Sequence, residues 1–79
     1  PEEAGEDELI EAMFREAIQR APTCAENRIC FAEYLHDHGR RIEAIQHARA
    51  AQELLPADPL VSSFDRPELQ RRVSDLLKG

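Results

Sequence analysis

The chain has 79 residues, a formal net charge of −6 and 33% charged residues. A chain of this length forms one small domain with a limited core. The acidic excess disfavours nucleic-acid binding, which needs a basic face, and contact with an anionic membrane surface; no apolar run approaches the ~20 residues of a membrane span.

The first predicted helix covers residues 6–21. Its apolar side chains recur at helical spacing and form one stripe that we expect to be buried. Pro22 ends the helix because it cannot continue the hydrogen-bond ladder. The stripe consists of Leu9, Ile10, Met13, Phe14, Ala17 and Ile18.

The second predicted helix begins within the segment Thr23-Cys24-Ala25-Glu26, which has the form of a capping box. It runs to about His38. Gly39 ends it, because glycine readily adopts the left-handed conformation that follows a helix. Its predicted core positions are Ile29, Phe31, Ala32 and Leu35.

The third predicted helix runs from Arg41 to Leu55. Ala44 and Ala51 lie beside its apolar face and should let a neighbouring helix approach closely. Pro56 and Pro59 then predict an extended linker through Ser63. The apolar face itself consists of Ile42, Ile45, Ala48 and Leu55.

The fourth predicted helix covers residues 66–78, with Asp65 as its N-terminal cap and an expected pair between Glu68 and Arg72. Its apolar stripe can cover the open end of a helix stack in its own chain or in a neighbouring chain. We favour its own chain, because a short stack needs that cover. The stripe consists of Leu69, Val73, Leu76 and Leu77.

No segment alternates with a period of two, so we expect an all-α antiparallel stack of about four helices. Several identities recur at a separation of 34 residues, a period typical of tetratricopeptide repeats. A punctuating glycine, a small alanine and a proline recur in the same order. The identical pairs are Gly5 and Gly39, Arg15 and Arg49, Ala17 and Ala51, Pro22 and Pro56, and Leu35 and Leu69.

The segment from Glu26 to Pro56 resembles a single tetratricopeptide repeat. Two positions depart from the family pattern, since Arg28 and Ala48 stand where large apolar or aromatic residues are usual. The positions that match are Phe31, Ala32, Leu35, Gly39, Ala44, Ile45, Ala51 and Pro56.

The resemblance implies one domain, 1–79, that is a fragment of a right-handed superhelix. In it, 6–21 would be the second helix of a partial repeat, 24–55 one full repeat, and 66–78 a capping helix. The implied function is a protein-interaction module that binds a peptide or partner helix on the surface of helix 23–38. The implied lining residues are Glu26, Ile29, Cys30, Glu33, His36 and Asp37.

Glu33 would repel a terminal carboxylate, so the expected ligand is an apolar segment that carries Lys or Arg. Two alternatives stay open. The lining residues can form an ordinary solvated helix face, and the chain can act as a structural capping or self-association segment without a separate ligand. We expect a monomer or weak dimer.

The cysteines and histidines do not have the paired short spacings of a structural zinc site. Cys24 and Cys30 are separated by six residues and would point apart on one helix, so we expect free thiols and a cytoplasmic location. Cys30 and His47 have no orienting third group, and no glycine-rich loop occurs. We therefore expect no enzymatic activity, cofactor or metal.

Overall fold

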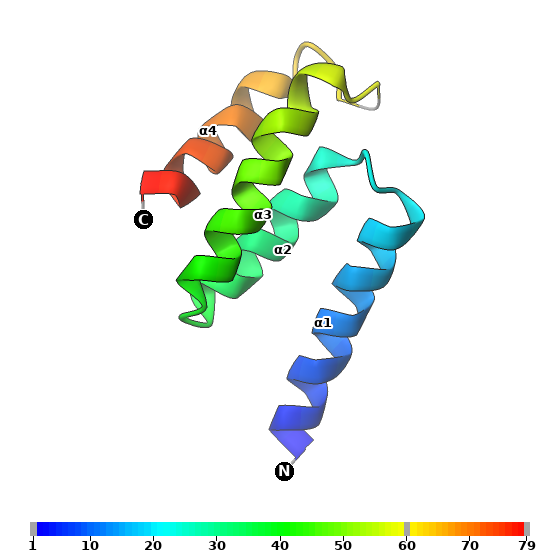
Figure 1. Ribbon diagram of the computed structural model, residues 1–79, viewed down its shortest axis with the longest axis vertical. Coiled ribbons are helices and arrows are strands. Elements are labelled where there is room, and N and C mark those ends of the chain that lie inside the picture. Colours follow the sequence, from blue (N-terminus) through cyan, green and yellow to red (C-terminus); the bar gives the residue numbers. More distant parts are fainter. Residues whose placement is uncertain (1, 60, 79) are drawn as a thin grey trace.

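The structure, a computed structural model, describes residues 2–59 and 61–78. These residues form helices α1 (Glu2–Arg20), α2 (Ala25–Asp37), α3 (Arg41–Leu54) and α4 (Arg66–Lys78), with a short 3-10 helix, η1 (Leu55–Ala57), after α3 (Figure 1). No strand occurs in the described part of the chain. The prediction of an all-α fold with antiparallel neighbouring helices is confirmed.

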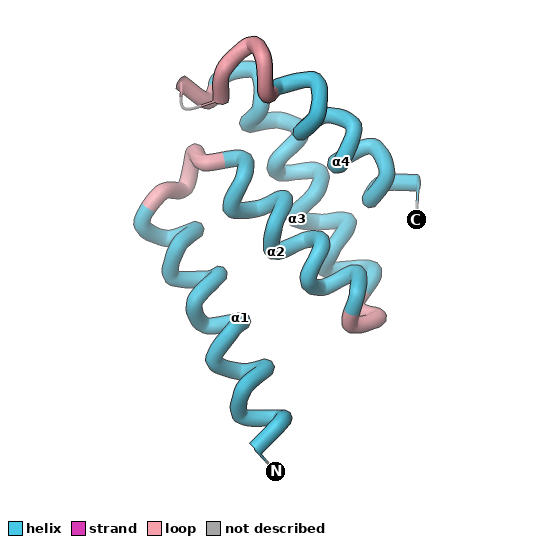
Figure 2. Tube along the Cα trace, turned by 180° about the vertical axis from the view of Figure 1, so that it is seen from behind, coloured by secondary structure: helices cyan, strands magenta, loops and turns pink. Residues whose placement is uncertain are grey.

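Helix α2 lies between α1 and α4, and it packs along α3 (Figure 2). Helix α4 contacts both α2 and α3 of its own chain, whereas α1 packs mainly on α2. The N-terminal end of α1 extends away from the other helices (Figure 1). Across the described residues, no helix is long and apolar enough to cross a membrane.

The turn between α2 and α3 forms as predicted. Gly39 has a φ of +76°, in the left-handed region. The amide of Arg40 donates to the carbonyl of Leu35 at 2.9 Å, and the amide of Gly39 donates to the carbonyl of His36 at 3.1 Å. These bonds close the last turn of α2 and reverse the chain, as a C-terminal glycine cap does.

Gly5 is not the structural counterpart of Gly39, although the repeat period pairs them. Helix α1 begins at Glu2 and passes through Gly5, four residues earlier than predicted. Gly39 is the glycine with positive φ in the described segments. The glutamates and alanine near Gly5 have high helix propensity, and the helix continues through the glycine. Gly5 therefore does not end or begin a helix.

The main core lies where α2, α3 and α4 meet. Alanines at the contact of α2 and α3 are fully buried, and they bring the two backbones close, as predicted from sequence. Ile42, predicted on the apolar face of α3, is instead 77% exposed, because no described helix covers the start of α3 on that side. Leu69, Val73 and Leu76 of α4 cover this core. Its buried members are Ala25, Ile29, Ala32, Ala48, Ala51, Leu55, Val61, Leu69, Val73 and Leu76.

The connection from α3 to α4 is not the extended linker predicted from its prolines. Leu55 and Val61 are buried in the main core. The amide of Asp58 donates to the carbonyl of Leu55 at 3.4 Å, and the amide of Val61 donates to the carbonyl of Asp58 at 3.3 Å. Pro56 lies within η1, where its fixed φ is compatible with a helical turn. These i to i−3 hydrogen bonds are turn bonds, which an extended linker would lack.

The predicted capping box at the start of α2 is wrong. Cys24 occupies the cap position and makes no side-chain capping bond. The amide of Ala25 donates instead to the Oδ2 atom of Asp58 at 2.9 Å. Asp58 is only 3% exposed, so a carboxylate from the connection after η1 satisfies the first amide of α2.

A second, smaller core joins α1 to α2 and α3. Phe31, Leu35 and Ala44 are buried there, and Phe14 and Ile18 of α1 pack against them. The rings of Phe14 and Phe31 are stacked with centroids 5.2 Å apart. Helix α1 is therefore held by the C-terminal half of its apolar stripe.

Ion pairs add to this contact. The guanidinium of Arg40 forms a bidentate pair with Glu43, at 3.0 and 2.8 Å, and also pairs with Glu11 of α1. The Oη atom of Tyr34 in α2 donates to the backbone carbonyl of Asp7 at 3.4 Å. Burial and the neighbouring Asp7 raise the pKa of the Tyr34 hydroxyl.

Candidate interaction surface

Five of the six predicted lining residues lie at the surface of α2. Glu26 and Asp37 are exposed, and three others are partly exposed: Cys30, Glu33 and His36. Ile29 is the exception, because it is fully buried in the main core. Ile29 therefore does not line this surface. It was predicted both as a core residue and as a lining residue, and its burial confirms the core position.

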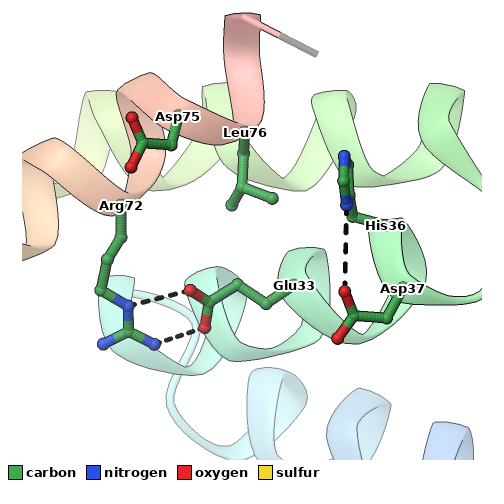
Figure 3. A pocket seen from close by; sticks show the side chains of 6 residues that line it. All are labelled: Glu33, His36, Asp37, Arg72, Asp75 and Leu76. Carbon is green, nitrogen blue, oxygen red and sulfur yellow. Dashed lines mark hydrogen bonds and ion pairs between the residues drawn. The ribbon is translucent and has the colours of Figure 1, made fainter.

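A pocket of about 380 Å³ lies between α2 and α4 (Figure 3). We call it the α2–α4 pocket. Three carboxylates face it, accompanied by one histidine, one arginine and one leucine. The lining residues are Glu33, His36, Asp37, Arg72, Asp75 and Leu76.

Arg72 of α4 forms a bidentate pair with Glu33 of α2 across this pocket (Figure 3). Its Nε atom donates to Oε2 at 3.0 Å, and its Nη2 atom donates to Oε1. Hydrogen bonding to Glu33 raises the pKa of the Arg72 guanidinium. The pairing predicted within α4 is thus replaced by a contact between helices.

Glu33 is consequently part of the structure that holds α4 in place. Charge-assisted bidentate pairs are stronger and more directional than single hydrogen bonds, and Arg72 also approaches the Sγ atom of Cys30 at 3.9 Å. Asp37 lies at the other end of the pocket, where its Oδ1 atom is 3.9 Å from Nδ1 of His36. Asp37 therefore offers a carboxylate to a ligand without linking two helices.

An apolar groove of about 340 Å³ lies on the other side of α2, against α1. We call it the α1–α2 groove. The α1 stripe was predicted to be buried, yet Leu9 and Met13 are 67% and 69% exposed, and Ile10 is 39% exposed. Helical spacing locates the stripe but not which of its residues a neighbouring helix covers. The groove is lined by Ile10, Met13, Phe14, Ala17, Asn27 and Cys30.

The histidines lie in separate surroundings. Nδ1 of His38 is 2.8 Å from the carbonyl of Tyr34, whereas His47 packs against Phe31 with ring centroids 4.7 Å apart. Burial, followed by Arg28 and Arg15, lowers the pKa of His47. Among the residues described, no three His, Cys, Asp or Glu side chains are placed to share a metal ion. Cys24 and Cys30 are free thiols.

Comparison with protein-family models, curated protein sequences and solved structures finds no match for this chain. The tetratricopeptide resemblance therefore rests on the sequence motif.

Proposed function

We propose that this chain is a protein–protein interaction module of the tetratricopeptide type, with its helices following the right-handed course of that family. Its ligand is a peptide or partner helix that binds on the exposed surface of α2. The role is one of binding, without catalysis, cofactor or metal. The resemblance of residues 26–56 to one repeat supports the family, and the position of α2 between α1 and α4 supports the surface.

The observation that carries the proposal is the composition of the α2–α4 pocket. Arg72 is engaged by Glu33, which leaves Asp37 and Asp75 to give the remaining surface a negative potential. Glu26 extends this acidic surface along α2. A ligand segment with Lys or Arg is attracted to such a surface, and a terminal carboxylate is repelled.

A structural capping or self-association role is the second candidate. The exposure of Leu9 and Met13 favours it, because a neighbouring helix from a second copy would cover these side chains. This candidate predicts a molecular mass that rises with concentration in sedimentation equilibrium. A monomeric mass at all concentrations would contradict it.

Peptide display against the full chain tests the first candidate. We expect selected peptides to contain Lys or Arg and to bind about tenfold more weakly to Asp37→Lys, since the charge reversal repels them. The control is Glu53→Lys, the same charge change at an exposed position of α3. Glu33→Lys is unsuitable because it also breaks the link to Arg72.

Circular dichroism should show equal helicity and thermal unfolding for both variants. Equal affinity of selected peptides for Asp37→Lys and Glu53→Lys would contradict the proposed surface. Failure to select any peptide would contradict peptide binding and favour the structural capping or self-association role.

A further inference from the structure

We propose that the α1–α2 groove binds one amphipathic α-helix of a partner protein. The apolar side of that helix lies in the groove, and Lys or Arg side chains lie along its edges. This inference rests on the proposed function. It adds the conformation of the ligand, its chemistry and a binding position that reaches α1.

The groove has the apolar lining that a bound amphipathic helix requires. Ile10, Met13, Phe14 and Ala17 follow helical spacing along α1, so they form a continuous apolar wall. The stacked ring of Phe14 fixes the base of that wall against α2. Amphipathic helices bind such hydrophobic grooves through apolar residues spaced by three or four positions.

The polar side chain in the groove is already engaged. The Nδ2 atom of Asn27 donates to the carbonyl of Ala17 at 3.4 Å, which links α2 to the end of α1. Among the lining residues, the largely exposed one is Met13, and methionine adapts its shape to different apolar ligands. The groove therefore presents apolar surface to a ligand, with little polar surface to desolvate.

The surrounding charge selects a basic ligand. Helix α1 contains seven acidic residues and two arginines. The opposite edge of the groove belongs to α2, where the exposed Glu26 precedes Asn27 in sequence and lies one turn before Cys30. A second copy that placed its own α1 in the groove would bring like charges together, whereas a helix with Lys or Arg would complement both edges.

Helix α4 supplies an internal example of this chemistry. It combines an apolar stripe with three arginines and one lysine, and it docks on the other side of α2 through Arg72 and Glu33. The surface of α2 thus already binds one basic amphipathic helix. The α1–α2 groove offers a second such position with its apolar wall uncovered.

The test uses a labelled helical peptide made of leucine and lysine, with leucines spaced by three and four residues. A twin peptide carries glutamate in place of every lysine. Fluorescence anisotropy measures the binding of both to the full chain near physiological salt. We expect the lysine peptide to bind at least about tenfold more tightly than its twin.

The discriminating variant is Met13→Glu, which adds negative charge while removing apolar surface from the groove. Nonspecific attraction would strengthen binding of the lysine peptide, whereas docking in the groove predicts a loss of about tenfold. The control is Ile42→Glu, the same kind of change at a side chain of α3 that is 77% exposed. Its affinity should stay within about twofold of wild type. Ile10→Glu is a second groove variant.

Each outcome separates the inference from the proposed function. Equal affinity of Met13→Glu and Ile42→Glu overturns the groove, and the α2 surface survives if Asp37→Lys still weakens binding. Loss in both groove variants with an unchanged Asp37→Lys supports the groove and contradicts the α2–α4 pocket. A wild-type chain that does not prefer the lysine peptide overturns the groove. The groove proposal is also overturned if the wild-type chain is a dimer without peptide and Met13→Glu makes it a monomer, because a second copy then occupies the groove.

Discussion

Helices α1 and α4 both flank α2, and both carry an apolar stripe, yet the two stripes have different fates. Leu69, Val73 and Leu76 of α4 are buried. In α1, Leu9 and Met13 stay largely exposed. The difference lies in the number of neighbours, since α4 contacts both α2 and α3 whereas α1 packs mainly on α2.

An amphipathic pattern predicts a helix and its apolar face but not what covers that face. Two neighbours form a groove that encloses a third helix, as α2 and α3 do for α4. A helix that packs mainly on one neighbour, as α1 does on α2, leaves part of its stripe in contact with water. The stability of the chain should therefore be concentrated in α2, α3 and α4, with α1 attached more weakly.

The largest expected effect is from Ile29→Ala, which opens a cavity in the core beneath α4. We expect a loss of about 2–5 kcal/mol in the free energy of unfolding, measured by urea denaturation. Leu9→Ala in the exposed part of α1 is the control and should change stability by less than about 0.5 kcal/mol. Equal losses of stability in Ile29→Ala and Leu9→Ala would show that the core beneath α4 and the exposed part of α1 contribute equally.

A smaller effect is expected from Phe14→Ala, which removes the ring stacked on Phe31. Phe14 is half-buried, so we expect the free energy of unfolding to fall by roughly 1–3 kcal/mol. This is less than the loss for a fully buried side chain, because part of the ring already contacts water. Hydrogen exchange should accelerate in the amides of α1 while those of α3 keep most of their protection. Uniform acceleration across all four helices would indicate that α1 unfolds only together with the others.

The smallest effect concerns pH and His47 of α3, which packs against Phe31 of the second core. Burial, followed by Arg28 and Arg15, lowers its pKa, opposed in part by Glu43. The unfolded chain then binds more protons than the folded one below about pH 6.5, so stability falls as the pH drops through that value. His47→Gln should reduce the fall between about pH 7.5 and 5.5, measured by thermal unfolding. An identical pH dependence would show that His47 does not contribute.

Much of the fold could be predicted because its signals are local. Gly39 determines the turn by its backbone freedom, and the heptad-like spacing of apolar residues locates α3 and α4 within about two residues. Contacts between distant segments could not be predicted in this way. The pair of Glu33 with Arg72 depends on how α4 crosses α2, and sequence spacing favoured Glu68 as the partner of Arg72.

The candidate site was predicted less well for the same reason. Ile29 was assigned to both core and surface because helical spacing alone does not say which neighbour a residue meets. Its burial follows from the position of α4. The exposure of Met13 follows from the position of α1, which packs mainly on α2.

The bond from Ala25 to Asp58 has a consequence for the order of folding. The two residues are separated by 33 positions. Helices usually complete their first turn with a residue close in sequence, which lets them form early. Here the acceptor arrives only after α3 and η1 have brought the chain back across α2, at the entropic cost of closing a long loop. During synthesis from the N-terminus, α2 emerges before Asp58 does, and its beginning is therefore the part of that helix completed last.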